Sequence, residues 1–291
     1  MKRLLILHCG PMKTGSTVIQ DALKFHRRSL LELGISFYHI LAKNLLRDLE
    51  EILLFEEEAM NPVVLLSSEF FWRENSGLLR QALSNFSGET HAILVSRPFR
   101  EVYPSLYLQN LKGRSKRIMS FKYFMERQIA IDTLNLDDGQ LMNAPSLDGR
   151  LSAAGCRTHW IRYDRDSLLI DFFESVQQIT SIPLSRFPEV NLEKPVGLSP
   201  RRSLRMEFAG LARAINCLNR LKLLPDQLRK KIFIALLDVS EHLNCFLGKA
   251  SPISKKHADR CDVVDRLVNQ AFLKHHQIDI SISKQSSEDD R

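Results

Sequence analysis

Long apolar runs are absent from this sequence, since none of its hydrophobic stretches approaches the ~18 residues that a membrane-spanning helix needs. The apolar run at residues 4–7 is short and is soon interrupted by His8 and Pro11, so we expect a first strand there and not a signal peptide. The five cysteines are widely spaced and form no C-x-x-C pair. That spacing argues against a disulfide framework or a zinc site. We therefore expect a cytoplasmic protein with no transmembrane segment.

Dense basic blocks are also absent. The formal net charge of +7 favours anionic ligands, but the lysines and arginines are scattered along the chain. We therefore expect no nucleic-acid partner. The composition, 44% hydrophobic and 26% charged, is that of a globular protein. A chain of 291 residues can bury one large α/β core with a helical extension, and its sequence leaves the oligomeric state open.

Short apolar runs alternate with segments of helical periodicity in the first two thirds of the chain. Strands are expected at residues 3–9, 35–38, 63–66, 92–95 and 158–163. Helices are expected at residues 16–33, 43–59, 73–86, 100–111, 120–134 and 166–178. This alternation predicts an α/β protein with a P-loop-like three-layer fold around a mainly parallel sheet. We assign this core to residues 1–200.

The remainder of the chain has a different character. Helical periodicity recurs at residues 201–222, 226–247 and 255–274. We expect residues 201–277 to pack on the core as a helical C-terminal extension of the same domain, and the polar tail 278–291 to be disordered. The polar segment 137–145 is expected to be a loop at the rim of the active site, and the proline-containing segment 181–200 a long loop that is either functional or mobile.

The loop after the first strand is the strongest local signal. It reads Gly10-Pro11-Met12-Lys13-Thr14-Gly15-Ser16-Thr17 and leads into a predicted helix. A strand, a glycine-bearing turn and a helix N-terminus together present backbone N–H groups to a phosphate-like anion. Two later strands end in Ser67-Ser68-Glu69 and in Ser96-Arg97-Pro98. If the strands are parallel, all three polar groups face one crevice.

Two common nucleotide-binding patterns do not fit this loop. A Walker A loop places its lysine directly after the second glycine, whereas Lys13 precedes Gly15 by two positions. No aspartate ends the second strong strand to hold Mg²⁺, and Glu69 is a poor substitute. The dinucleotide pattern G-x-G-x-x-G is absent as well.

The motifs resemble those of the sulfotransferase family that uses 3′-phosphoadenosine 5′-phosphosulfate (PAPS), in particular its bacterial, carbohydrate-sulfotransferase-like members. That family carries a P-K-[ST]-G-[ST]-[ST] loop after the first strand, and this chain has the same order with Met12 as one extra residue. The second signature of the family is an arginine that ends a later strand, with a serine eight residues on. Arg97 and Ser105 have this spacing.

The resemblance implies that the enzyme is a PAPS-dependent sulfotransferase. It implies that PAPS is the co-substrate and that no metal is needed. The 5′-phosphosulfate would be held by the loop residues Lys13, Thr14, Gly15, Ser16 and Thr17. Arg97 and Ser105 would hold the 3′-phosphate. Lys13 would also act in catalysis, because it can neutralise the charge that develops on the leaving 5′-phosphate.

The acceptor of the sulfuryl group needs a general base, and Glu69 is our first candidate. The alternative is that Glu69 only orients Lys13 or caps the next helix. His39 is the second candidate for the base. By resemblance we expect the acceptor to be a small molecule or a glycan, with a hydroxyl on a carbohydrate or glycolipid most favoured.

Two other functions stay open from the sequence. One is a nucleotide-dependent kinase of the P-loop class, against which the register of Lys13 and Gly15 argues. The other is a non-catalytic nucleotide-binding module on the sulfotransferase fold. Activity that depends on Mg²⁺ would indicate the kinase. Nucleotide binding without transfer of labelled sulfate to any acceptor would indicate the non-catalytic module.

Overall fold

The computed structural model describes residues 3–10, 15–41, 44–59, 61–71, 74–112, 119–134, 144–164, 166–187, 208–247, 258–263 and 265–266. The chain divides into two compact units. The first, which we call the sheet unit, comprises Met1–Arg97, Asn135–Leu198 and Leu267–Arg291. The second, which we call the helical unit, comprises Pro98–Leu134 and Ser199–Arg266.

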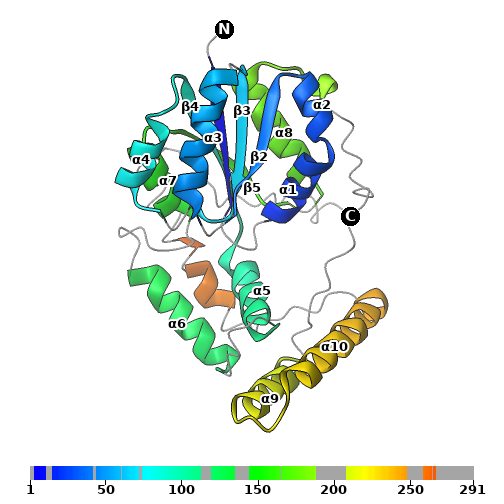
Figure 1. Ribbon diagram of the computed structural model, residues 1–291. Coiled ribbons are helices and arrows are strands. Elements are labelled where there is room, and N and C mark those ends of the chain that lie inside the picture. The colour runs from blue at the N-terminus through cyan, green and yellow to red at the C-terminus, as the bar shows by residue number, and fades with distance from the viewer. Residues whose placement is uncertain are drawn as a thin grey trace, which may run out of the picture. The chain divides into compact units, whose positions relative to one another are not determined.

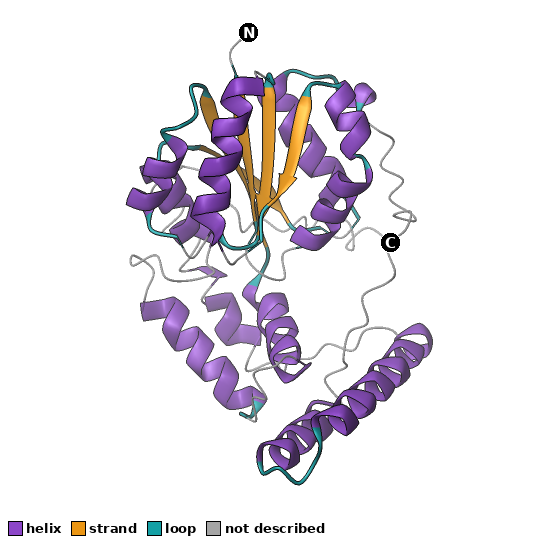
Figure 2. Ribbon diagram, in the orientation of Figure 1, coloured by secondary structure: helices purple, strands orange, loops and turns teal. Residues whose placement is uncertain are grey.

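The sheet unit is built on five parallel strands in the order β2-β3-β1-β4-β5 (Figures 1 and 2). The strands are β1 (Leu4–Cys9), β2 (Ile35–His39), β3 (Val63–Ser68), β4 (Glu89–Ser96) and β5 (Arg157–Arg162). The two central strands β1 and β3 are almost fully buried along their length, which explains their continuous apolar sequences. All five strands lie where the sequence predicts them.

Helices cover both faces of this sheet, as Figure 1 shows. One face packs against α3 (Leu45–Ala59), α4 (Ser76–Leu83) and α7 (Ala144–Ala153). The opposite face packs against α1 (Ser16–Phe25), α2 (Arg27–Glu32) and α8 (Leu168–Thr180). The α/β class and the parallel three-layer arrangement are therefore confirmed for the sheet unit.

Two local features differ from the sequence-based expectation. The helix predicted over residues 16–33 is two helices, because the chain leaves the helical conformation at His26 between α1 and α2. Gly34 ends the second helix with a φ of 77°, as the cap glycine predicted there requires. Helix α7 was not predicted. Its core-facing stripe consists of Leu147 and Leu151 among polar residues, which is too weak a periodicity to detect.

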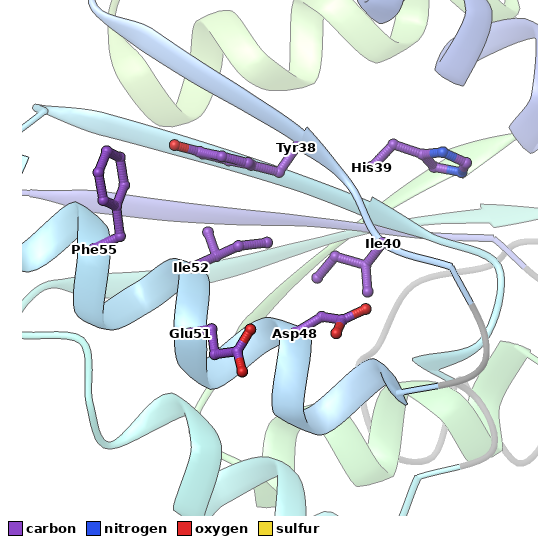
Figure 3. A pocket seen from close by; sticks show the side chains of 7 residues that line it. All are labelled: Tyr38, His39, Ile40, Asp48, Glu51, Ile52 and Phe55. Carbon is purple, nitrogen blue, oxygen red and sulfur yellow. The ribbon is translucent and has the colours of Figure 1, made fainter.

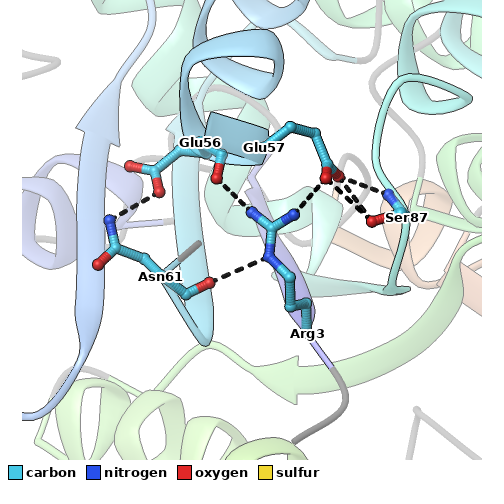
Figure 4. A network of polar contacts seen from close by, with 5 residues as sticks. All are labelled: Arg3, Glu56, Glu57, Asn61 and Ser87. Carbon is cyan, nitrogen blue, oxygen red and sulfur yellow. Dashed lines mark hydrogen bonds and ion pairs between the residues drawn. The ribbon is translucent and has the colours of Figure 1, made fainter. Parts of the chain in front are cut away.

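A buried polar network lies at the amino end of β1 (Figure 4). This end is opposite to the strand ends that carry the predicted site residues. Arg3 donates to the carbonyl oxygens of Glu56 (2.5 Å) and Asn61 (3.3 Å) and forms an ion pair with Glu57 at 2.6 Å. The fully buried Glu56 accepts from the hydroxyl of Tyr38 at 2.5 Å. Burial, followed by this bond to Glu56, raises the pKa of Tyr38 to about 12. The network ties β1 and β2 to the end of α3.

The helical unit contains α5 (Phe99–Lys112), α6 (Phe121–Leu134), α9 (Ala209–Arg220) and α10 (Asp226–Leu247). Residues 258–263 and 265–266 are also helical. The backbone N–H of Phe99, at the start of α5, donates to both carboxylate oxygens of Asp265 at 3.1 and 3.2 Å. Burial raises the pKa of Asp265 to about 7, although the bond from Phe99 opposes this shift.

Of the predicted helical C-terminal extension, the structure confirms individual helices and not their packing. Helices α9 and α10 match the segments predicted at residues 201–222 and 226–247 within a turn or two. Their packing on the core stays a prediction, and the tail 278–291 and most of the loop 181–200 lie outside the described residues. No helix among the described residues is both long and apolar enough to cross a membrane.

Candidate active site

The strand order creates a topological switch point at the carboxyl ends of β1 and β4. The chain leaves β1 toward β2 and leaves β4 toward β5, so the connections from these neighbouring strands run in opposite directions. In open α/β sheets, ligands bind beyond the strand ends at such a topological switch point. The Lys13 loop follows β1, and Arg97 follows β4. The topology therefore places the ends of the two strands that precede these motifs side by side.

Gly15 forms the start of helix α1 in a left-handed conformation with a φ of 82°. Its carbonyl oxygen accepts the first helical hydrogen bond, from the N–H of Val18 at 2.8 Å. Only glycine adopts this backbone conformation without strain. The predicted anion-binding residues Lys13 and Thr14 lie outside the described residues, so their part of the loop stays a prediction.

Side chains crowd the free side of Gly15. A Cβ atom placed on Gly15 would lie 2.5 Å from Cδ2 of Leu168 and 2.9 Å from Cε2 of Tyr163. Both contacts are far inside van der Waals distance. The position thus demands glycine for two reasons, its backbone conformation and the lack of space.

Gly15→Ala is expected to lower the free energy of unfolding by about 1–3 kcal/mol from backbone strain, with a further loss from the steric contacts. Chemical denaturation would measure the change. Gly155→Ala is a matched control for strain alone, because Gly155 also has a positive φ (96°) but open space around its Cβ position. Gly210→Ala controls for the substitution itself, since Gly210 lies in α9 with nothing nearby. A Gly15 variant no less stable than the Gly155 variant would contradict the steric part.

Glu69 lies directly after β3 and contacts the start of α1. Its Oε1 atom accepts from the hydroxyl of Ser16 at 2.8 Å and from that of Thr17 at 3.4 Å. Three of the predicted site residues are therefore joined by hydrogen bonds between the start of α1 and the segment after β3, which are more than 50 residues apart in sequence. Because both bonds end on Oε1, the Oε2 atom keeps lone pairs with which to accept a proton.

The histidines at this edge of the sheet differ in their surroundings. His39 ends β2, and it interacts electrostatically with Glu69, Lys24 and Asp21. Burial, followed by the charge of Lys24, lowers the pKa of His39, which favours its neutral imidazole. His8 is fully buried in β1, with Nδ1 2.8 Å from the hydroxyl oxygen of Ser67. Burial lowers the pKa of His8 to about 3, which suits a structural role.

The aromatic ring of Tyr163 lies against Arg97. Tyr163 was not among the site residues predicted from the sequence. The guanidinium carbon of Arg97 lies 4.2 Å from the ring centroid of Tyr163. The N–H of Tyr163 donates to the carbonyl oxygen of Ser96 at 2.7 Å, which continues the pairing of β4 and β5 by one residue. The same ring flanks Gly15. The only signal in the sequence was the place of Tyr163 at the end of a predicted strand.

Ser105, the partner predicted for Arg97, lies on α5. Arg97 is the last residue of the first segment of the sheet unit, and Ser105 belongs to the helical unit. Its side chain is partly exposed. That these two residues hold one phosphate stays a prediction from their spacing.

A pocket of about 340 Å³ opens beside the carboxyl end of β2 (Figure 3). Tyr38, His39 and Ile40 line it from β2 and its end, and Asp48, Glu51, Ile52 and Phe55 line it from α3. The residues from α3 recur at helical spacing and so share one face of that helix. Figure 3 shows the His39 ring pointing away from α3. Carboxylates beside aromatic and aliphatic walls can bind a ring that carries hydroxyl groups.

Within the parts of the chain that the structure describes, no group of three or more histidine, cysteine, aspartate or glutamate residues could hold a metal ion. Comparison of the chain with protein-family models, with curated proteins and with solved structures finds no match. The function is therefore inferred from the residues and their geometry.

Proposed function

We propose that this protein is a PAPS-dependent sulfotransferase with a P-loop-like fold that transfers a sulfuryl group to a hydroxyl on a carbohydrate or glycolipid. The observation that carries the proposal is the position of Tyr163. One aromatic ring contacts both the guanidinium of Arg97 and the glycine of the anion-binding loop. Two predicted anion-binding elements that are distant in sequence therefore lie beside the same side chain. A nucleotide with phosphates at both its 5′ and 3′ positions would use both.

The donor would be bound through its charges. The start of α1, at Gly15 and Ser16, offers backbone N–H groups and the positive end of the helix dipole to the 5′-phosphosulfate. Lys13 adds a positive charge at the leaving oxygen. Arg97 offers a planar guanidinium to the 3′-phosphate, and stacking on Tyr163 restricts its orientation. Ser105 would complete that site.

Transfer of the sulfuryl group is an in-line displacement in which positioning and charge neutralisation dominate, as in phosphoryl transfer. The acceptor oxygen forms a bond to sulfur while the bond from sulfur to the 5′-phosphate oxygen breaks. Glu69 accepts the proton of the acceptor hydroxyl on Oε2. Ser16 and Thr17 hold the carboxylate in place through Oε1. His39 is the alternative base, because burial favours its neutral imidazole and it lies within electrostatic range of Glu69.

The pocket between β2 and α3 supports a ring-shaped acceptor. It opens at the same edge of the sheet as Glu69, because His39 of β2 pairs with Ser67 of β3, two residues before Glu69. Asp48 and Glu51 can accept hydrogen bonds from hydroxyl groups, while Tyr38 and Phe55 offer apolar ring faces. These features favour a sugar over a purely apolar acceptor.

Calorimetric titration tests the nucleotide specificity. We expect 3′-phosphoadenosine 5′-phosphate (PAP) to bind at least about tenfold more tightly than 5′-AMP or ATP, because only PAP engages a separate 3′-phosphate site. Equal affinity for the three nucleotides would contradict the proposal. Affinity for ATP that depends on Mg²⁺ would instead support the kinase.

Catalysis is tested separately from binding. A screen of glycans and phenols with PAPS, read by mass spectrometry, should find an acceptor that gains one sulfate. If PAP binds tightly but a broad acceptor panel stays unmodified, the chain is better described as a non-catalytic nucleotide-binding module.

A further inference from the structure

The turn between α9 and α10 has a defined hydrogen-bond pattern and carries exposed leucines. Lys222 adopts the left-handed conformation, with a φ of 60°, directly after α9. The N–H of Leu223 donates to the carbonyl oxygen of Leu218 at 2.9 Å. The N–H of Lys222 donates to the carbonyl oxygen of Asn219 at 3.0 Å. This pair of bonds is a Schellman motif, in which the side chains at the positions of Leu218 and Leu223 commonly meet. We call residues 218–231 the hairpin tip.

The apolar side chains of the hairpin tip are exposed. The exposed fractions are 44% for Leu218, 63% for Leu221, 70% for Leu223 and 45% for Leu228. Single exposed leucines are common on protein surfaces, but four within eleven residues of one turn form a patch. Leu221 and Leu223 flank the left-handed residue and are the most exposed of the four.

The same tip is rich in positive charge. Arg220, Lys222, Lys230 and Lys231 are all exposed, and Asp226 is the one acidic residue of the segment. Lys222 occupies, at a cost in backbone strain, a position where glycine would be free of strain. A lysine is thus held at the apex of the turn despite that cost. In the sequence, these basic residues lie on both sides of the exposed leucines.

Buried polar contacts hold the tip in this form. The side-chain amide of Asn219 donates to the carbonyl oxygen of Leu224 at 2.7 Å and to Asp226 at 2.9 Å. At the base of the hairpin, Arg229 donates to the side chain of Asn216 at 2.8 Å, and Asn216 donates to the carbonyl oxygen of Leu111 in α5 at 3.0 Å. The exposed leucines are therefore carried on a fixed scaffold within the helical unit.

We propose that the hairpin tip docks on an anionic membrane surface, with Leu221 and Leu223 entering the headgroup region and the surrounding cations contacting acidic lipid headgroups. Leucine side chains gain by leaving water for the interface, and each lysine or arginine near an anionic surface adds attraction. Long basic side chains can reach the headgroups while their stems stay among the lipids. This proposal stands independently of the sulfotransferase activity.

The composition of the tip favours a membrane over a protein partner. Protein interfaces are depleted in lysine and enriched in aromatic residues. The segment 218–231 contains three lysines and no aromatic residue. Its net positive charge is complementary to acidic lipids and opposes self-association through this surface.

Vesicle flotation of the full-length protein tests the proposal. We expect binding to vesicles of equimolar phosphatidylcholine and phosphatidylglycerol, weak binding to phosphatidylcholine alone, and weakening when the salt rises from about 0.1 to about 0.5 M. The double variant Leu221→Ser/Leu223→Ser should bind at least about tenfold more weakly. Lys230→Gln/Lys231→Gln should lose about fivefold per charge. Thermal unfolding should show that both variants stay folded.

Matched controls separate the tip from general surface properties. Leu31→Ser/Leu54→Ser removes two leucines, each 57% exposed, from the sheet unit and should leave vesicle binding unchanged. Lys122→Gln/Arg127→Gln removes two exposed cations from α6 and should have a small effect. Failure of the unaltered protein to bind anionic vesicles would overturn the proposal, as would equal losses in the control variants. A concentration-dependent dimer that only the Leu221/Leu223 variant abolishes would assign the tip to self-association.

Discussion

Glu69→Gln is expected to lower kcat of sulfuryl transfer by about 100-fold or more, the range that a positioned general base contributes. The affinity for PAP should change little, because the amide keeps the size of the carboxylate and its oxygen can still accept from Ser16. The substitution removes proton acceptance and leaves most of the local structure. Steady-state kinetics with a sulfated product read by mass spectrometry would measure kcat, and calorimetry would measure nucleotide affinity.

The competing role for Glu69 is structural, since its hydrogen bonds to Ser16 and Thr17 anchor the start of α1. A pH profile distinguishes the two roles. If Glu69 is the base, the rise of kcat with pH in the unaltered enzyme should disappear in the Gln variant. Glu58→Gln, an exposed change on α3, is the matched control and should leave kcat intact. Full activity of the Glu69 variant would move the role of base to His39.

Arg97→Ala is expected to remove the preference for a 3′-phosphate. A hydrogen bond to a charged group contributes about 1.5–3 kcal/mol, so loss of even one such bond from the guanidinium should weaken PAP binding by roughly 10- to 150-fold. Binding of 5′-AMP should be nearly unchanged, because 5′-AMP carries no 3′-phosphate. Calorimetric titration of both nucleotides into the same variant gives the ratio directly.

The control for this experiment lies three residues away. Arg100 is an exposed cation in the first turn of α5, so Arg100→Ala changes the net charge equally. It should weaken PAP binding by less than about threefold, since exposed charges contribute little. Equal losses for PAP and 5′-AMP in the Arg97 variant would contradict a role in 3′-phosphate recognition. They would instead indicate that stacking of Arg97 on Tyr163 supports the crevice as a whole.

The outcome of the vesicle experiment does not depend on the outcome of the nucleotide experiments. Loss of vesicle binding in the Leu221/Leu223 variant would leave PAP affinity intact, because those substitutions lie in the turn between α9 and α10. Conversely, a protein that binds vesicles but discriminates no nucleotide would keep the membrane proposal and lose the sulfotransferase proposal. If both succeed, a glycolipid becomes the first class of acceptor to test.

The sequence by itself determined the local elements of the sheet unit. Continuous apolar runs such as residues 63–66 can be satisfied only by burial on both faces, and this requirement predicts a parallel strand before any partner is known. Gly15 and Gly34 mark positions of positive φ because no other residue adopts them without strain. The register of Lys13 against Gly15, and the spacing of Arg97 and Ser105, likewise depend on the chain alone.

Only the tertiary structure decided which of these elements meet. The order β2-β3-β1-β4-β5 places the ends of β1 and β4 side by side, although their sequences lie more than 80 residues apart. Tyr163 became a site residue because its ring fills the space between Arg97 and Gly15, a contact that no local pattern encodes. The exposure of Leu221 and Leu223 is equally a result of packing. Periodicity shows which side chains share a face, whereas burial depends on what the rest of the chain places against it.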